Sequence, residues 1–355
     1  MTQEAMQINA GVDPAKLSQV FRDSGRLPVG ASLGELRTEP IGTGQMADTL
    51  RCRVVQGGAD AIPSSFVVKL PVAEGQTAVT ARHAAVYDRE FRFYSELRPQ
   101  LPMLQCPEFY GSYALDGEPA LVLEDVPGIQ GDQIAGASPI QARQAVDQLA
   151  GLQSRWWDDK SFGRQEWLQR RAGVPIAERQ NRYIAAWQKV RASVESDLMP
   201  GAIEVIEKFG EQCDSWSRAY SGPMCLVHHD FRLDNILFSE DRIWVVDWQT
   251  LGWGPPAWDL AYFLGSSLSV QDRRANERGL VARHADQLRA LGVDGWTDEI
   301  AWDAYRQMAY GVFLLTMPAA GEVRTNERAR QMYVAMWNRA ATMVLDLNSS
   351  EFLEV

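Results

Sequence analysis

A group of polar residues in the second half of the chain has the types and spacing that phosphate chemistry requires. The sequence reads H-x-D-x-x-x-x-N from His228, which includes Asp230 and Asn235, and a further carboxylate follows at Asp247. Phosphoryl transfer needs a carboxylate to orient the attacking hydroxyl and accept its proton, together with oxygen ligands for Mg²⁺. The spacing therefore predicts Asp230 as a catalytic residue and Asn235 and Asp247 as metal ligands.

Two short strand-like runs are expected to position these ligands. The runs Asn235–Phe238 and Ile243–Val246 are separated by a polar turn at residues 239–242, which predicts a hairpin. Asn235 begins its first strand and Asp247 ends its second, so both ligands should lie at one end of the hairpin. An alternative interpretation makes these residues ordinary turn caps, a common role for Asp and Asn, but the complete spaced set favours the site.

A single lysine in an apolar run is the next candidate. Lys69 interrupts the strand-like sequence Phe66–Leu70, where an unpaired ammonium group would be costly. Glu90 is a carboxylate on the apolar stripe of a predicted helix over Ala81–Leu97. The two residues resemble the kinase pair that holds nucleotide phosphates. The alternative is a surface lysine and a solvated glutamate.

Two glycines precede this strand, in the run Ile41-Gly-Thr-Gly-Gln-Met-Ala47. Gly42 and Gly44 would let backbone N–H groups approach a phosphate, although a plain hairpin turn also fits and Ala47 replaces the third glycine of the kinase pattern. A dinucleotide-binding loop does not fit, because the sequence after Gly44 reads as a strand and that loop leads into a helix.

The chain changes character near residue 126. Residues 35–126 are rich in strand-like runs, namely 50–55, 65–70 and 120–124, whereas the sequence after Ser138 is mostly helical, with segments expected at 139–157, 176–193 and 202–220. This pattern predicts an α+β protein with an N-terminal helical extension at 1–33, a small sheet-containing lobe at 34–126 and a larger helical lobe at 127–355.

The composition of the 355 residues argues against several classes of protein. A net charge of −11 opposes binding to nucleic acid, which requires a positive surface. The four cysteines have neither disulfide nor metal-site spacing and are expected to be small buried hydrophobes. No apolar stretch approaches the roughly 20 residues of a membrane span, and the N-terminus lacks the pattern of a signal peptide. A cytoplasmic location is therefore expected.

The stretch around His228 resembles the catalytic loop and metal-binding segment of the aminoglycoside phosphotransferase and choline kinase-like superfamily. The continuation Pro255-Pro-Ala-Trp-Asp-Leu-Ala-Tyr-Phe-Leu-Gly-Ser-Ser267 extends the resemblance and is most similar to the ecdysteroid kinase-like branch. The resemblance implies a two-lobed protein-kinase-like fold, use of ATP and Mg²⁺, and a small-molecule hydroxyl as acceptor. It also implies that Asp259 braces the catalytic loop.

The same resemblance assigns further positions. The run Ala120–Val126 resembles the linker between lobes, where backbone groups near Glu124 and Val126 would meet adenine. Arg232 stands near the place of the catalytic-loop lysine of protein kinases and is a candidate for the γ-phosphate, although pairing with Asp234 fits equally well. His229 occupies a position that is glycine in many members of the family.

Aromatic residues on the expected helices of the second lobe are predicted to be mainly core, and some of them fit an acceptor pocket. They are Trp156, Trp157, Trp302, Tyr305, Tyr310 and Phe313.

The resulting expectation is a small-molecule kinase. A catalytically silent nucleotide sensor is the alternative, disfavoured because all the residues that the chemistry requires are present. A protein kinase is disfavoured by the long helical insert between Val126 and His228 and by Asp-Trp-Gln in place of Asp-Phe-Gly. Sterol-like, hydroxyacyl, aminoglycoside, choline and sugar acceptors all remain open, and the sequence makes no prediction of the oligomeric state.

Overall fold

The structure is a computed structural model that describes residues 11–42, 47–56, 62–72, 85–169, 176–322 and 326–353. The chain divides into two compact units. The first contains residues 1–100, 106–127 and 246–249, and the second contains residues 101–105, 128–245 and 250–355.

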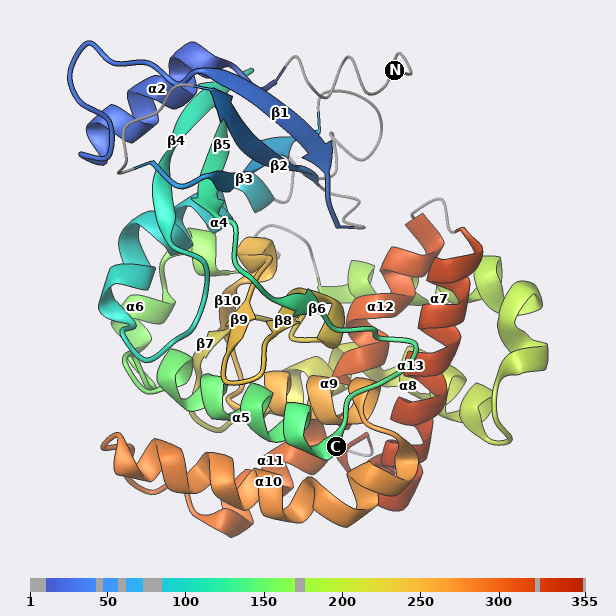
Figure 1. Cartoon of the computed structure of the whole chain (residues 1–355). Helices are drawn as coiled ribbons and strands as arrows, with labels where there is room; N and C mark the ends of the chain where they lie inside the picture. Colours follow the sequence, from blue (N-terminus) through green and yellow to red (C-terminus); the bar gives the residue numbers. More distant parts are fainter. Residues whose placement is uncertain are drawn as a thin grey trace. The chain divides into compact units, whose positions relative to one another are not determined.

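A five-stranded antiparallel sheet forms the centre of the first unit (Figure 1). Its strand order is β1-β2-β3-β5-β4. The strands are β1 (Glu35–Pro40), β2 (Ala47–Gln56), β3 (Ser65–Pro71), β4 (Phe109–Leu115) and β5 (Glu118–Glu124). The expected strand-like runs at 50–55, 65–70 and 120–124 fall within β2, β3 and β5.

Alternation along β3 separates its two faces. Phe66, Val68 and Leu70 are almost fully buried and belong to a core that also contains residues of helix α2 (Pro14–Asp23). The Phe21 ring of α2 meets the Phe66 ring edge-on at 5.0 Å. Since side chains alternate along a strand, Lys69 points to the opposite face of the sheet from Phe66 and Val68.

The helix expected over residues 81–97 is interrupted in the structure. Residues 81–84 lie outside the described part, α4 spans Val86–Arg92, and a single π-helical segment, η1, continues over Phe93–Leu97. Glu90 is therefore on a short α-helix, where its side chain is 3% exposed.

In its described residues, the second unit contains two small sheets and most of the helices. The hairpin expected at residues 235–246 is present, with β8 (Ile236–Phe238) antiparallel to β9 (Ile243–Val245) and β6 (Ile129–Gln130) on the other edge of β8. Strand β7 (Cys225–Val227) pairs separately with β10 (Gly252–Gly254).

The α-helices of this unit are α5 (Pro139–Gln153), α6 (Lys160–Gly163), α7 (Ile176–Val194), α8 (Ala202–Ala219), α9 (Ala257–Ser267), α10 (Val270–Ala290), α11 (Asp298–Gln307), α12 (Gly311–Glu322) and α13 (Glu327–Asp346). Every residue of α9 is buried, and this helix contacts α5, α10, α11, α12 and α13. Its sequence is largely apolar, as expected for a helix surrounded by others. Figure 1 shows α9 among the other helices of the unit.

One expectation about this unit is wrong. Trp156 and Trp157 were expected on a helix spanning 139–157, but α5 ends at Gln153. Asp158 has a positive φ of 49°, and Asp159 caps the next helix through its side chain, so the two tryptophans lie in the turn between helices. Trp156 stacks on Phe162 with ring centroids 4.4 Å apart.

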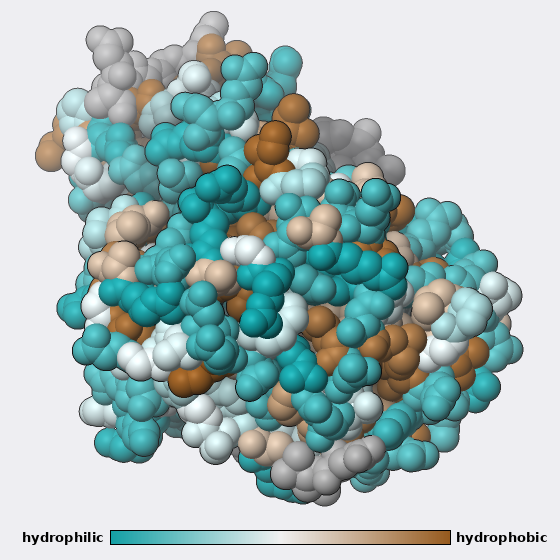
Figure 2. Space-filling view, turned by 90° about the horizontal axis from the view of Figure 1, so that it is seen from below, coloured by the Kyte–Doolittle hydropathy of each residue, from teal (hydrophilic) through white to brown (hydrophobic). Residues whose placement is uncertain are grey.

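Of the other aromatic residues expected to be core, Tyr305, Tyr310 and Phe313 are fully buried, whereas Trp302 is half-buried. All four cysteines are buried, and none of them forms a disulfide. Within the described residues no helix combines the length and apolarity required to cross a membrane. The face drawn in Figure 2 is mainly hydrophilic, with hydrophobic residues in small groups among the polar ones.

Candidate active site

The loop that contains Asp230 begins directly after β7 and is fixed by a buried carboxylate. Asp259, near the start of α9, is fully buried and accepts hydrogen bonds from the backbone N–H groups of His228 (2.7 Å) and His229 (2.8 Å). Hydrogen bonds to a charged acceptor are stronger than neutral ones. This contact agrees with the bracing role that the family resemblance implied for Asp259.

His229 adopts a backbone conformation that favours glycine. Its φ is 67°, which explains physically why a glycine suits this position. Its carbonyl oxygen accepts a hydrogen bond from Trp258 Nε1 at 3.1 Å, and its Nδ1 lies 3.2 Å from the Thr250 carbonyl oxygen. Because a carbonyl oxygen can only accept, Nδ1 carries a proton in this arrangement. Left-handed residues with side chains occur preferentially at functional sites.

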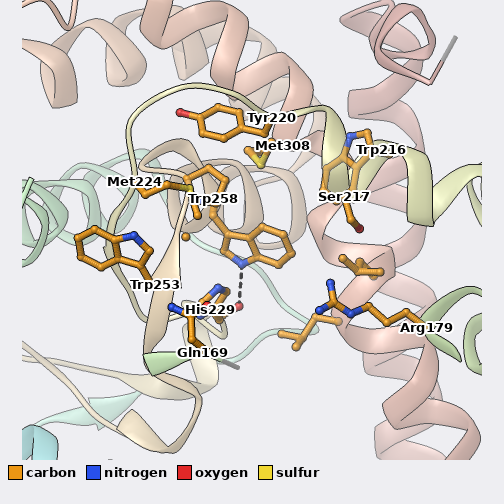
Figure 3. Close-up of a pocket in the computed structure, with 14 residues that line it drawn as sticks. Gln169, Arg179, Trp216, Ser217, Tyr220, Met224, His229, Trp253, Trp258 and Met308 are labelled. Atoms are coloured by element: carbon orange, nitrogen blue, oxygen red, sulfur yellow. Dashed lines mark hydrogen bonds between the residues drawn. The ribbon is translucent and has the colours of Figure 1, made fainter. Parts of the chain in front are cut away.

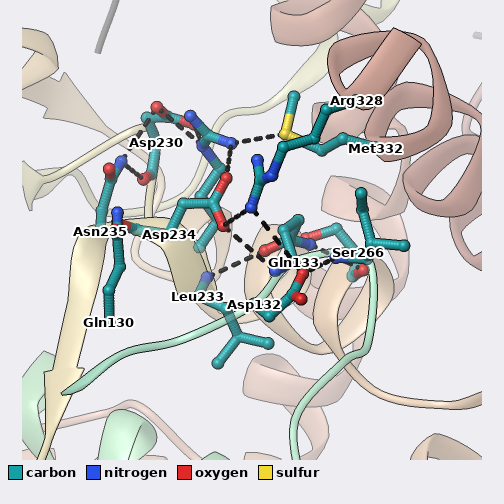
Figure 4. Close-up of polar contacts among 12 residues, drawn as sticks. Gln130, Asp132, Gln133, Asp230, Leu233, Asp234, Asn235, Ser266, Arg328 and Met332 are labelled. Atoms are coloured by element: carbon teal, nitrogen blue, oxygen red, sulfur yellow. Dashed lines mark hydrogen bonds and ion pairs between the residues drawn. The ribbon is translucent and has the colours of Figure 1, made fainter. Parts of the chain in front are cut away.

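Three side chains hold the carboxylate of Asp230. Tyr262 of α9 donates to Oδ1 at 2.9 Å. Asn235 Nδ2 donates to Oδ2 at 3.1 Å, and Figure 4 shows Asn235 beside Asp230. Arg232 Nε lies 3.1 Å from Oδ1 and 3.2 Å from Oδ2. The carboxylate is 17% exposed, so it is fixed in direction yet reachable.

Arg232 bridges two acidic residues. Besides Asp230, its Nη1 contacts Asp234 Oδ2 at 3.0 Å, so the predicted alternative pairing with Asp234 is present. Burial alone would lower the pKa of Arg232, but the charges of Asp230 and Asp234 outweigh it and hold the pKa above its usual value. Asp234 also accepts a hydrogen bond from the Gln133 backbone N–H at 3.1 Å. Arg232 therefore orders the loop in addition to any contact with phosphate.

Asp230 fixes the orientation of the Asn235 side-chain amide. Its Nδ2 donates to the backbone carbonyl of Asp230 at 2.8 Å as well as to the carboxylate. Since the amide nitrogen is committed to Asp230, the amide oxygen points in the other direction. Asn235 ends a short 3-10 turn, Leu233–Asn235, immediately before β8.

In the first unit, Lys69 joins two carboxylates. Its Nζ lies 2.6 Å from Glu90 Oε2 and 2.6 Å from Asp247 Oδ1, so the predicted pairing with Glu90 is present. Burial would lower the pKa of Lys69, but the charges of Asp247 and Glu90 outweigh this effect and raise it. Burial raises the pKa of Glu90 despite the opposing charge of Lys69.

The segment 246–249 is attached to α4 by more than this ion pair. The backbone N–H of Trp248 donates to Glu90 Oε1 at 3.2 Å, and the Trp248 ring stacks on Phe93 with centroids 3.9 Å apart. Asp247 has a φ of 67°. The carboxylate of Asp247 is thereby presented in a strained backbone conformation with Lys69 on one oxygen and the Gln249 side-chain amide on the other.

The structure describes three of the four remaining predicted nucleotide contacts. Gly42 lies in the connection between β1 and β2 with a φ of 76°, whereas Gly44 lies outside the described residues. Glu124 ends β5, where its N–H donates to the Glu108 carbonyl at 2.8 Å and its carboxylate accepts from the Glu108 N–H at 3.0 Å. Val126 is buried.

The two residues predicted as metal ligands lie in different units, Asn235 in the second and Asp247 in the first. Each carries an oxygen donor of the kind that Mg²⁺ prefers, an amide oxygen and a carboxylate oxygen. Among the described residues, no cluster of three or more His, Cys, Asp and Glu side chains could enclose a metal ion. Magnesium commonly takes only one or two protein carboxylates and completes its shell with substrate phosphates and water.

Two contributors were missed by reasoning from the sequence. Tyr262, which contacts Asp230, lies three residues after Asp259, so both face the loop from one side of α9. That helical spacing was a readable signal. Gln133 donates to the carbonyl of Ser266 and accepts from the N–H of Leu233, yet nothing in its local sequence distinguishes it.

Comparisons with known proteins place these observations in context. The model of the family described as "Phosphotransferase enzyme family" matches residues 38–305. No curated protein matches the sequence.

Among solved structures, a choline kinase from Cryptosporidium parvum is similar with a TM-score of 0.58 at 10% identity, over 96% of this chain and 98% of that one. An ethanolamine kinase from Plasmodium vivax has a TM-score of 0.54 at 10% identity, over 88% of this chain and 81% of that one. A choline kinase from Streptococcus pneumoniae has a TM-score of 0.50 at 13% identity, over 94% of this chain and 98% of that one. At these identities the likeness shows a two-lobed, kinase-like fold.

Proposed function

The chain belongs to the phosphotransferase enzyme family, and we propose that it is a small-molecule kinase that moves the γ-phosphate of ATP to a hydroxyl group. The observation that carries the proposal is the environment of Asp230. Its carboxylate is held by Tyr262, Asn235 and Arg232 on a loop whose backbone is anchored by Asp259.

In the proposed reaction, Asp230 orients the acceptor hydroxyl. The hydroxyl oxygen forms a bond to the γ-phosphorus while the bond from that phosphorus to the β–γ bridging oxygen breaks, and the hydroxyl proton passes to Asp230. ADP leaves with the bridging oxygen. The fixed direction of the carboxylate supports this role, because its three donors restrict it to one orientation.

The nucleotide is assigned to the residues of the first unit. Lys69, held by Glu90, would bind the phosphates, Gly42 and Gly44 would bring backbone N–H groups to them, and the backbone near Glu124 and Val126 would meet adenine. Asn235 and Asp247 would hold Mg²⁺, which when bound supplies positive charge to the phosphates. Arg232 is proposed to reach the γ-phosphate from its position beside Asp230.

In this proposal, residues 34–126 form the nucleotide lobe, residues 127–355 form the acceptor lobe and residues 1–33 form an extension. The protein is proposed to be cytoplasmic and to belong to the ecdysteroid kinase-like branch, a relationship supported by the sequence from Pro255 to Ser267. The structurally similar proteins named as choline and ethanolamine kinases are consistent with a small alcohol as acceptor.

The test is ADP formation by the purified chain with ATP and Mg²⁺ against pooled alcohols, grouped as sterols, hydroxy acids, sugars, aminoglycosides and choline-like amines. Mass spectrometry should find an acceptor heavier by one phosphoryl group in a single pool. Binding of Mg²⁺ and ATP with no phosphorylated product in any pool would contradict the proposal and favour a nucleotide sensor.

A further inference from the structure

A cavity beside the candidate catalytic loop is large enough for a small ligand. It encloses about 300 Å³, at the lower end of the range of ligand pockets. Its residues come from α7, α8, α9, α12 and the loops between them (Figure 3). His229 forms part of its wall and is the residue immediately before Asp230. The cavity therefore shares backbone with the loop assigned to catalysis.

The wall combines large aromatic rings with polar groups. Trp216, Trp253 and Trp258 line it together with Gln169, Ser217 and His229. The rings can remove a flat or extended apolar group from water. The ligand should accordingly contain an apolar part as well as polar groups.

The charge of the wall has one sign. Among the described residues that line the cavity there is no Asp or Glu, whereas Arg179 of α7 is present. Figure 3 shows the Arg179 side chain directed inward, towards Trp258. Its Nε is buried and has no hydrogen-bond partner among the described residues. An unsatisfied buried donor on a cation is the group that an incoming anion can satisfy.

One acidic residue interacts with Arg179 from behind the wall. Asp214 of α8 interacts electrostatically with Arg179 but also with Arg218, so one carboxylate is shared by two guanidinium groups. Burial raises the pKa of Asp214 despite both of these charges. Asp214 itself does not line the cavity.

We propose that this cavity holds the acceptor, and that the acceptor is an apolar alcohol carrying an acidic group that pairs with Arg179. The identification of the ligand as the acceptor rests on the proposed function. In this arrangement Arg179 is a specificity-determining residue, and the alcohol class is a hydroxy acid with a largely hydrocarbon body.

Aromatic walls alone would also fit a quaternary ammonium group through cation–π contacts. The inward guanidinium and the absence of an acidic residue from the described wall oppose that alternative, because a cation would meet a like charge and no carboxylate. Choice between the two chemistries therefore depends on Arg179.

Calorimetric titration with three probes of equal chain length tests the inference: octanoate, 1-octanol and octyltrimethylammonium. The full chain should bind octanoate about tenfold more tightly than octanol, the effect of roughly one charge-assisted hydrogen bond, and the ammonium probe least tightly. In Arg179→Gln the preference for octanoate over octanol should disappear, whereas Arg179→Lys should retain part of it.

Arg182→Gln is the matched control, because Arg182 lies on the same helix, is exposed and does not line the cavity. Its probe affinities should equal those of the wild type. Equal or tighter binding of the ammonium probe, survival of the anion preference in Arg179→Gln, or absence of binding by all three probes would overturn the inference. Octanoate has no hydroxyl, so these results are independent of whether ATP is turned over.

Discussion

Asp230 shows how a candidate catalytic carboxylate is restricted by its neighbours. Two of its donors, Arg232 and Asn235, are local in sequence, whereas Tyr262 comes from α9. Burial and then the nearby Asp230 charge raise the pKa of Tyr262 well above its usual value, so its hydroxyl remains a donor. Tyr262 therefore acts through Asp230, as a positioning residue.

Tyr262→Phe should reduce kcat by about tenfold, which corresponds to roughly 1.4 kcal/mol, and leave KM for ATP nearly unchanged. The expected loss arises because one oxygen of Asp230 would no longer be held. Steady-state kinetics with an identified acceptor measures both quantities.

Tyr305→Phe provides the control for this substitution. Tyr305 is fully buried and donates to Glu277 Oε2 at 2.9 Å, so the same group is removed from a buried carboxylate elsewhere in the second unit. Both variants should lose stability by about 2 kcal/mol, the value of a hydrogen bond to a charged group. Equal kcat values in the two variants would argue against a positioning role for Tyr262.

Lys69→Met should destabilise the protein by about 3 kcal/mol, because it leaves the buried carboxylate of Glu90 without its cation. Burial already raises the pKa of Glu90, and loss of Lys69 should raise it further. The native state would then bind more protons than the unfolded state. Relative to the wild type, the free energy of unfolding should fall as the pH rises above about 5.

The double variant Lys69→Met with Glu90→Gln separates charge from packing, since it has no buried carboxylate at position 90. Urea unfolding between pH 5 and 8 should show the additional pH dependence in the single variant and not in the double variant. The same slope in both would show that Glu90 is not the titrating group.

At the scale of elements, α9 connects the core to the site. Its buried surface contacts five other helices, and Asp259 and Tyr262 on its first turns reach the loop of Asp230. The start of helix α5 is stabilised locally by a capping box. The Ser138 side chain accepts a hydrogen bond from the Gln141 backbone N–H, and the Gln141 side chain accepts one from the Ser138 backbone N–H. The loop of Asp230 is thus supported by a helix that the core itself holds in place.

The contact between α10 and α5 contains a buried histidine and gives a prediction about acid. His284 Nε2 is 2.8 Å from Gln153 Oε1, and burial lowers the pKa of His284 to about 4 from an ordinary value of 6.5. The unfolded chain therefore binds a proton at a higher pH than the native protein does. Stability from this residue is complete above pH 6.5 and is lost as the pH falls towards 4, by up to about 3 kcal/mol.

His284→Gln should remove this dependence, although it will lower stability at neutral pH. Urea unfolding at pH 7 and pH 4.5 should show a smaller acid-induced loss in the variant than in the wild type. An identical loss in both proteins would exclude His284 as a contributor.

Local patterns allowed prediction of these elements to different degrees. The strands β2, β3 and β5, the hairpin of β8 and β9, and the pairing of Lys69 with Glu90 follow from alternation and helical spacing, which are properties of neighbouring residues. The tryptophans at 156 and 157 were misplaced because an apolar pattern does not show that α5 ends at Gln153, before the left-handed Asp158 and the N-cap Asp159 of the next helix.

At the scale of the whole molecule, the family and the two-lobed kinase-like fold expected from the sequence are confirmed by the family match and the similar structures. The spacing of Asp230 and Asn235 could be predicted because both lie in one continuous loop. The acceptor cavity could not, since its wall combines residues from Gln169 to Leu315 whose proximity depends on helix packing. The residues that would recognise the acceptor can therefore be identified only from the tertiary structure.

Asp230 is proposed to carry the transfer of phosphate to the acceptor hydroxyl. Single-turnover phosphorylation of the acceptor found in the pooled assay, with saturating ATP and Mg²⁺, tests this role by comparing the wild type with Asp230→Asn. The variant should lose about 10² to 10⁴-fold in rate, the usual contribution of a general base, with ATP affinity unchanged. Phosphorylation at the wild-type rate by the variant would show that Asp230 does not have this role.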